Sequence, residues 1–317
     1  MNRTSVAAIA VVVLVIIISS VAFALHENRS PSSQDKITVT YILDGQNVTE
    51  TIKLPVKRVV SMDPSNTQMM FAIGAGNLVV ADTSYDWWPS NATKLPKVEM
   101  DNGTASVEEV ISMNPDLVLA YGGIQPPQII DQLENNSIPV LVFQPQDIQQ
   151  IYQDMLVLGN VTGHESGAVK EVNSMKQEIQ SIQQKVSPYP RVSVLYMLWS
   201  NPIYTAGPGS FINNILEVAG AVNIAENLSS PYPEISMEQI IYSNPQAIIV
   251  DNDTPISNMS YFTTGAQAPL WQNITAIQTG RVLFFNATES NWMNEPGPLT
   301  VYAVRTVAEF LYPQAFQ

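Results

Sequence analysis

The chain has 317 residues, of which 45% are hydrophobic and only 13% are charged. Its length is enough for two domains of ordinary size, and its apolar content indicates a globular protein. The net charge is −14, so the chain lacks the basic stripe that phosphates require, and we predict that it does not bind nucleic acid. It contains no cysteine, which excludes disulfides, iron–sulfur clusters, thiol catalysis and a lipid anchor on an N-terminal cysteine.

Residues 1–25 are typical of a signal peptide or an N-terminal membrane anchor. Arg3 precedes an apolar run from Val6 to Ile18, and Ala22-Phe23-Ala24 has the small-x-small pattern of a cleavage site. The apolar stretch is also long enough to span a bilayer, so cleavage and retention both stay open. In either case we expect the rest of the chain to be secreted or held at the extracellular face of the cytoplasmic membrane, after a polar tether at residues 26–36.

Asn-x-Ser/Thr triplets, the acceptor sites of N-glycosylation, occur about three times as often as random placement of these residues would give. They begin at Asn28, Asn47, Asn91, Asn102, Asn135, Asn160, Asn227, Asn252, Asn258, Asn273 and Asn286. We predict a glycosylated cell-surface protein. The alternative is an asparagine-rich composition in which these sites are unused.

Residues 37–160 are predicted to form an N-terminal lobe. Residues 37–54 alternate between apolar and polar around Asp44-Gly45, which predicts a β-hairpin. Short apolar strands then alternate with helices, an order typical of a parallel sheet with helices on both faces. At the first of these helices, Ser65 with Gln68 three residues later has the pattern of a capping box.

A long helix is predicted from His164 to Val186, within a backbone segment at residues 161–187. Apolar residues recur on it at spacings of three and four, and Ser187-Pro188 ends it because the residue before proline leaves the helical region. The recurring residues are Val169, Val172, Met175, Ile179, Ile182 and Val186. A C-terminal lobe at residues 188–317 then repeats the strand–helix order.

Similar sequence stands on both sides of this helix. The residues in register are Ser106, Glu108, Ile111, Asn114 and Pro115 in the first lobe and Ser236, Glu238, Ile241, Asn244 and Pro245 in the second. Flanking pairs in the same order are Arg58 with Arg191 and Ala75-Gly76 with Ala219-Gly220. We therefore predict an α/β fold of two related Rossmann-like lobes with parallel sheets, joined by one long backbone helix and preceded by the hairpin. The alternative is a chance similarity between short α/β segments.

Ligands of an open α/β sheet bind where strand ends and helix starts converge. The loops expected there are dense in aromatic side chains, which suit a large ligand that is flat or apolar. The candidate ligand-binding residues are Ser65, Asn66, Thr67, Tyr85, Trp87, Trp88, Tyr121, Trp199, Tyr204 and Trp292. We expect Trp292 in a loop from Asn286 to Pro298, and Trp199 and Tyr204 in another loop. The alternative for each ring is a packing role at the edge of the core.

The sequence carries no catalytic constellation. Of its two histidines, His26 lies in the tether and His164 at the start of the long helix, and no nucleophile motif or His-Glu-x-x-His motif occurs. We therefore predict that the protein is not an enzyme and has no catalytic residues, no metal ligands and no cofactor.

Glu108 and Glu238 occupy the same place in the two repeats, near the start of a short helix. An acid in the first turn stabilises a helix through its dipole by roughly 0.3–1 kcal/mol, which is a purely structural role. The alternative is a matched pair of acids, one in each lobe, that a symmetric partner could bind.

Several motifs in this order resemble one known family. They are RVVSMDPSNTQMMFAIGAG, TSYDWWP, KLPKV, SVEEVISMNPDLVLA, GSFINNILEVAGAVNIAENL, YPEISMEQIIYSNPQAIIV and GRVLFF. The chain is similar, from Val56 to Pro313, to the substrate-binding proteins of ABC importers for cobalamin and ferric siderophores, the class with a helical backbone. The resemblance implies a monomer that binds its ligand between the lobes with little closure. It also implies that Glu108 and Glu238 dock onto arginines of a permease dimer, which works with ATPase subunits.

On this resemblance we expect an extracytoplasmic protein that captures a metal chelate, a corrinoid or a ferric siderophore, and delivers it to the permease. The crevice loops carry almost no arginine, which many binders of anionic ferric chelates use, and this favours a corrinoid. One alternative is a haem receptor of the same fold, with Tyr85, Tyr121 or Tyr204 as iron ligand. Others are a sensor or adhesion domain without transport, and an enzyme on a similar scaffold, which the missing cysteines and the export segment disfavour.

Overall fold

The computed structural model describes residues 36–101, 104–264, 266 and 268–317. The predicted signal or anchor segment and almost all of the tether lie outside these residues. Residues 37–317 form one compact unit. Within the part of the chain that is described, no helix combines the length and the apolar character needed to cross a bilayer.

The predicted hairpin is confirmed. It consists of β1 (Lys36–Leu43) and β2 (Gln46–Lys53), which pair as a two-stranded sheet. Asp44 and Gly45 between them have φ of 50° and 72°. Positive φ at both central residues gives a two-residue turn the twist that the flanking strands require, and Asp-Gly adopts it readily.

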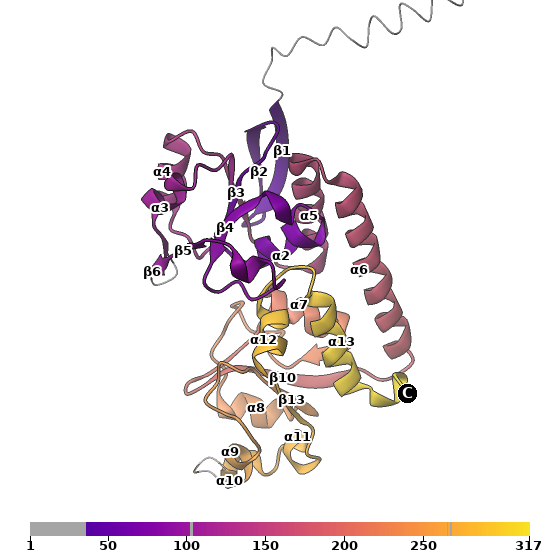
Figure 1. The fold of residues 1–317 in the computed structure, drawn as a ribbon. Helices are drawn as coiled ribbons and strands as arrows, with labels where there is room; N and C mark the ends of the chain where they lie inside the picture. Colours follow the sequence, from indigo (N-terminus) through magenta and orange to yellow (C-terminus); the bar gives the residue numbers. More distant parts are fainter. Residues whose placement is uncertain (1–35, 102–103, 265, 267) are drawn as a thin grey trace, which may run out of the picture. The chain divides into compact units, whose positions relative to one another are not determined.

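A five-stranded parallel sheet organises the first half of this unit, which we call lobe 1 (Figure 1). In the order of the sheet its strands are β5 (Lys97–Val98), β4 (Val79–Thr83), β3 (Val59–Ser61), β8 (Leu117–Tyr121) and β9 (Val140–Phe143). Its helices are α2 (Pro64–Ala72), α3 (Val107–Ser112), α4 (Pro127–Asn135) and α5 (Ile148–Thr162), and a small antiparallel pair is β6 (Met100–Asp101) with β7 (Thr104–Ala105). Of these strands, β8 (LVLAY) and β9 (VLVF) are almost entirely apolar, as is typical of a parallel sheet that helices cover on both faces.

A second five-stranded sheet organises the other half, lobe 2. β12 (Ala221–Asn223), β10 (Val192–Ser200), β13 (Ala247–Val250) and β14 (Val282–Phe284) are parallel, and β11 (Ile203–Thr205) adds to β10 in the antiparallel direction. Its helices are α7 (Phe211–Val218), α8 (Met237–Ser243), α9 (Ser260–Thr263), α10 (Ala268–Trp271), α11 (Thr275–Gln278), α12 (Ala287–Asn294) and α13 (Thr300–Leu311). The predicted pair of α/β lobes is confirmed, with one antiparallel strand that the sequence did not indicate.

The predicted long helix is confirmed as α6 (Glu165–Val186), which packs against α5 and α13. Its buried stripe is Ala168, Val172, Met175, Ile179, Ile182 and Val186. Val169, which the periodicity placed in the stripe, is 48% exposed. Ala168 takes its place because the alternation of four and three residues, continued back from Val172, reaches position 168.

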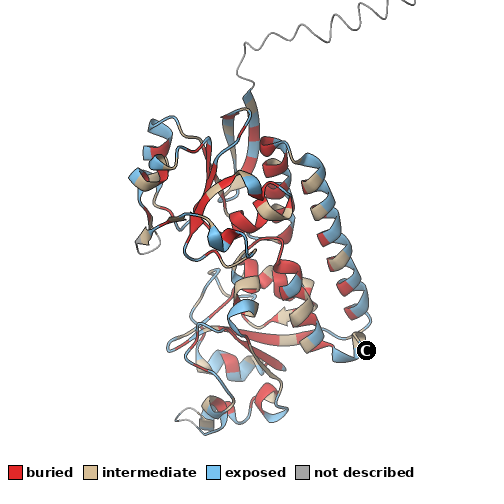
Figure 2. Cartoon of the chain, viewed as in Figure 1, coloured by how far each residue is buried: buried red, intermediate tan, exposed pale blue. Residues whose placement is uncertain are grey.

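One hydrophobic core runs without interruption through lobe 1, α6 and lobe 2. Figure 2 shows its buried residues along the inner sides of α5, α6 and α13. Two smaller clusters fill the remaining face of each sheet, one in each lobe. Large independent movements of the lobes would expose the shared apolar surface to water, at a cost of about 25 cal/mol per Å².

The two copies of the sequence repeat form equivalent structures. The hydroxyls of Ser106 and Ser236 cap α3 and α8, and Asn114 and Asn244, which follow these helices, have φ of 49° and 42°. Asparagine is one of the few residues that visit the left-handed region routinely. This backbone requirement gives a physical reason for an asparagine at the same place in both lobes.

The sequence match pairs Arg58 with Arg191, but the structure aligns the strands that precede the two repeats, β3 and β10, with a shift of two residues. The carbonyl of Arg58 accepts a hydrogen bond from Asp116 N at 2.8 Å, and the carbonyl of Ser193 accepts one from Gln246 N at 2.9 Å. Arg58 is therefore equivalent to Ser193 and not to Arg191. A shift by two leaves every side chain on the same face of a strand, so a short apolar run matches almost equally well in either register.

The glycine pair of the sequence match is displaced in the same way. Gly74 and Gly220 follow the first helix of their lobes with φ of 88° and 89°, the conformation in which a helix commonly ends. Gly74, rather than Gly76, is therefore the counterpart of Gly220.

Candidate functional site

The first helix of lobe 1, α2, begins at the carboxyl end of β3, the edge where ligands of open α/β sheets bind. Asp63 caps it by accepting a hydrogen bond from Ser65 N at 2.8 Å. The predicted capping box of Ser65 and Gln68 is wrong because the helix starts earlier, at Pro64. Proline suits the first helical position, where its missing N–H is not needed.

Ser65, Asn66 and Thr67 are each at most 1% exposed. Asn66 donates from Nδ2 to the carbonyl of Ala120 at 3.0 Å, which ties the start of α2 to the end of β8. Its Oδ1 has no hydrogen-bond partner among the residues the structure describes. These side chains shape the start of α2, and their contact with a ligand stays a prediction.

The two lobes touch at Glu295, in the segment between α12 and α13. Its carboxylate accepts hydrogen bonds from Gln68 Nε2 of α2 and from Trp87 Nε1, the latter at 2.9 and 3.0 Å to its two oxygens. Burial raises the pKa of Glu295 to about 8, while the bond from Trp87 opposes this shift and the neighbouring carboxylate of Asp63 adds to it. Sequence reasoning missed Glu295 because a single glutamate before Pro-Gly-Pro belongs to no motif.

The loop after β4 places its aromatic side chains in different surroundings. Asp86 fixes this loop by accepting two hydrogen bonds from Thr83, at 2.8 Å from its N and 2.7 Å from its Oγ1. Tyr85 is 62% exposed, Trp87 bonds to the glutamate of lobe 2, and Trp88 lines a pocket beside α6. The three rings, adjacent in sequence, therefore form no single platform.

In lobe 2, the predicted loop that carries Trp199 and Tyr204 is a β-hairpin instead. β10 and β11 pair with Trp199 opposite Tyr204, and the chain turns at Asn201-Pro202. Proline indicated a loop, but it occupies the turn, where no ladder N–H is needed. Cross-strand partners project from the same face, so these rings, 43% and 40% exposed, form one aromatic surface.

Trp292 lies on a helix, not in the loop predicted for it. Asn286 and Glu289 form a capping box that starts α12. The Trp292 ring lies against Tyr302 of α13, with their centroids 5.2 Å apart. Trp292 thus packs the two helices that follow β14 together.

Two tyrosines from different lobes lie near each other. Tyr121 ends β8, and the pKa of its phenol is raised above the ordinary range by burial first, then by Asp63, then by Tyr232 of lobe 2. Tyr232 is 53% exposed and was not among the predicted residues. The sequence Pro231-Tyr232-Pro233, an aromatic residue between two prolines in a loop of lobe 2, could have indicated Tyr232 as a candidate.

Glu108 and Glu238 occupy the first turns of α3 and α8, and both side chains are exposed. Neither forms an ion pair within the described ranges. Their positions make the structural role, a favourable charge at a helix start, available to both. Their docking role stays a prediction.

The residues that the structure describes bring together no group of three or more His, Asp or Glu side chains that could hold a metal ion. The strand-end loops therefore supply aromatic surface, buried carboxylates and hydrogen-bonding groups. Such a site is suited to binding a preformed molecule.

The sequence and the fold are both similar to those of known binding proteins. The sequence matches the periplasmic binding protein family over residues 59–288. It is 31% identical over 304 residues to the uncharacterized ABC transporter substrate-binding lipoprotein YvrC of Bacillus subtilis (strain 168), with 92% of this chain and 91% of that protein covered. It is 26% identical over 258 residues to the vitamin B12-binding protein of Vibrio cholerae serotype O1, with 81% and 90% covered. The crystal structure of the Vibrio cholerae periplasmic vitamin B12 binding protein BtuF has a TM-score of 0.70 and 24% identity, with 83% of this chain and 99% of that chain covered.

Proposed function

The chain belongs to the periplasmic binding protein family, and on that premise we propose that it captures a corrinoid between its two lobes and delivers it to an ABC permease. The family resemblance drawn from the sequence motifs is thereby confirmed. A relative that is named for vitamin B12 binding and is 26% identical over 258 residues supports the corrinoid as ligand. Of the two metal chelates predicted from the sequence, a corrinoid and a ferric siderophore, the proposal therefore takes the corrinoid.

The chemistry of the strand-end loops carries the proposal. Segments 63–68, 84–90, 121–127, 199–210, 224–236 and 285–299 contain no lysine and no arginine, but they contain Asp63, Asp86, Glu226, Glu234, Glu289 and Glu295. Anionic ferric chelates and the propionates of haem would meet the ionised members of this acidic set and no cationic partner, which costs binding energy. A corrinoid is bulky and carries neutral amide side chains around its ring, and the ring system can lie against the side chains of Trp199 and Tyr204.

Delivery rests on the two exposed acids. Glu108 and Glu238 belong to equivalent helices, and among the described residues neither has a cationic partner that would have to be displaced. A permease dimer that presents one basic site per subunit would match one acid in each lobe. If the N-terminal segment is retained, it would hold the protein at the extracellular face of the cytoplasmic membrane, and if it is cleaved the protein would be secreted. Every described acceptor asparagine of the glycosylation triplets is exposed.

Calorimetric titration of the full chain in a non-ionic detergent tests the ligand. We expect one-to-one binding of cobalamin, with quenching of tryptophan emission, and binding of an anionic ferric siderophore or haem that is weaker by at least roughly a hundredfold. Tighter binding of haem would replace the corrinoid by the haem alternative. No binding of any of the three would overturn the ligand assignment.

A further inference from the structure

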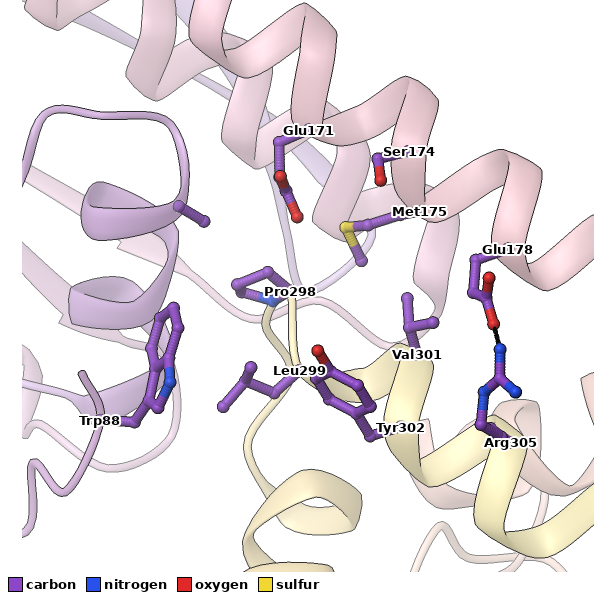
Figure 3. A pocket seen from close by; sticks show the side chains of 11 residues that line it. Trp88, Glu171, Ser174, Met175, Glu178, Pro298, Leu299, Val301, Tyr302 and Arg305 are labelled. Carbon is purple, nitrogen blue, oxygen red and sulfur yellow. Dashed lines mark hydrogen bonds and ion pairs between the residues drawn. The ribbon is translucent and has the colours of Figure 1, made fainter.

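A pocket of about 500 Å³ lies on the α6 side of the molecule, where three parts of the fold meet. Lobe 1 contributes Ala72 and Trp88, α6 contributes one wall, and the start of α13 contributes another (Figure 3). The function proposed above draws on Trp88, Pro298 and Leu299 only as parts of the strand-end loops, and it does not use the walls that α6 and α13 contribute. Its chemistry indicates a ligand of its own.

Two aromatic rings flank the pocket. Trp88 stands on one side and Tyr302 on the other, with Leu299 between them (Figure 3). Tyr302 is held from behind by the ring of Trp292, at a centroid distance of 5.2 Å. Tryptophan and tyrosine rings attract cations because their faces carry negative charge density.

The pocket also holds one carboxylate that feels the positive charge of Lys170 on the same helix but forms no ion pair with it in the described part of the chain. Glu178 pairs with Arg305, which in turn lies 3.6 Å from Glu309, so one arginine is shared by two acids and this group is itself net negative. Glu171 extends its carboxylate into the pocket (Figure 3) and forms no ion pair within the described part of the chain. Burial raises the pKa of Glu171, which indicates a carboxylate partly removed from water.

Apart from Ser174 and the pair of Glu178 and Arg305, the rest of the lining is apolar. Met175, Pro298, Leu299 and Val301 form it together with Ala72. A bare divalent cation would require several oxygen ligands, and one carboxylate beside this apolar surface cannot supply them. A cation that carries methyl or methylene groups can contact the aromatic rings and the carboxylate through its charge and the apolar wall through its alkyl groups.

We propose that this pocket is a second binding site and that it takes a small organic monocation, such as one with a quaternary ammonium group. The net charge of −14 raises the local concentration of cations at the protein surface. Because the walls come from both lobes and from α6, an occupant would contact all three parts of the fold.

Calorimetric titration of the full chain with choline tests the proposal, with the neutral carbon isostere of choline as the matched ligand. We expect saturable one-to-one binding of choline and binding of the isostere that is weaker by roughly tenfold or more. Glu171→Gln should weaken choline binding by roughly tenfold, and Tyr302→Leu by roughly fivefold. Glu165→Gln, which removes an exposed charge from the first turn of the same helix, should leave it unchanged.

Three results would overturn this site. Equal binding of choline and its neutral isostere would show that charge is not recognised. Equal losses in Glu171→Gln and Glu165→Gln would show attraction to the overall negative charge only. Absence of choline binding to the wild-type chain at millimolar concentration would show that the pocket does not have this function. Thermal unfolding like that of the wild type in Glu171→Gln and Tyr302→Leu checks that both variants are folded.

Discussion

The two lobes share a repeated framework but present different chemistry to each other. At the strand ends of lobe 1, Ser65, Asn66 and Thr67 are buried and engaged within their own lobe, and the acids Asp63 and Asp86 hold the loops. At the strand ends of lobe 2, the β10–β11 hairpin displays aromatic rings. One lobe thus offers a rigid polar edge, and the other offers an exposed aromatic surface.

The features that the lobes share are those of the scaffold and the outer face. Equivalent serines cap α3 and α8, and equivalent asparagines follow these helices in the left-handed conformation. Equivalent acids, Glu108 and Glu238, lie in their first turns. A partner that is symmetric needs a face that is symmetric, whereas one asymmetric ligand does not. The comparison predicts where substitutions in the two lobes should have equal effects and where they should not.

The largest effect is expected from reversing both acids. Replacing Glu108 and Glu238 by lysine should abolish uptake into vesicles that contain the cognate permease, because two repulsive contacts replace two attractive ones. Each single reversal should reduce uptake to the same extent if the partner is symmetric. Ligand affinity of the isolated protein should stay within a few-fold of wild type, and its loss would contradict a docking role.

A smaller and unequal effect is expected on ligand affinity. Trp199→Ala should weaken corrinoid binding by about 1–3 kcal/mol, the range for an aromatic anchor, measured by calorimetry. Ser65→Ala should change affinity by less than about threefold and lower stability instead, because its hydroxyl bonds to Asp63. Tyr242→Ala is the control, since this ring is 92% exposed on α8. A larger loss of corrinoid affinity in Ser65→Ala than in Trp199→Ala would contradict the proposal that lobe 2 supplies the stronger ligand contact.

The scaffold was predictable from sequence because its signals are periodic or local. The spacing of apolar residues on α6, the Asp44-Gly45 turn and the repeated serine caps each report on a few neighbouring residues. The errors arose where two readings of a local signal compete. Asp63 and Ser65 are both good caps, and a strand shifted by two residues keeps its faces.

The site was less predictable because its contacts join residues far apart in sequence. Aromatic content drew attention to the segments around Tyr85 and Trp199, but it did not indicate that Trp199 lies in a strand or that the rings of Trp87 and Trp88 separate. The bond between Trp87 and Glu295 spans both lobes, and no local pattern indicates such a contact.

A difference of about 1 kcal/mol is expected between the asparagines of the two repeats. Asn114→Ala and Asn244→Ala both place alanine in the left-handed region, which costs about 1–2 kcal/mol. Asn244 also accepts a hydrogen bond from Thr275 N at 2.8 Å, so its replacement should cost about 1 kcal/mol more. Denaturant unfolding measures both. Asn114→Gly, which relieves the backbone, is the control and should cost less than Asn114→Ala. Equal costs in the two alanine variants would contradict the added role of Asn244.

The last prediction concerns the contact between the lobes. The pKa of Glu295 is raised from 4.5 to about 8, so the folded state binds the proton more tightly than the unfolded state. Its contribution to the free energy of unfolding is therefore full below pH 4.5 and is lost as the pH rises through 8. Glu295→Gln keeps an acceptor for Trp87 and Gln68 but cannot ionise, and should flatten this decline in thermal unfolding measured across the pH series.

Between pH 7 and 8, the pH dependence of stability distinguishes Glu295 from the acids whose pKa values rise only to about 6. The pKa values of Asp63 and Asp82 rise only to about 6, so their losses are nearly complete before the pH reaches 7. Asp154, buried within α5, also has a raised pKa, and Asp154→Asn is therefore the control for a group that lies inside one lobe. If the bond between the lobes carries the effect, Glu295→Gln but not Asp154→Asn should also change how strongly corrinoid binding depends on pH, because the Glu295 carboxylate accepts a hydrogen bond from Gln68 of α2. Parallel stability profiles for Glu295→Gln and wild type would show that this carboxylate does not hold the lobes together.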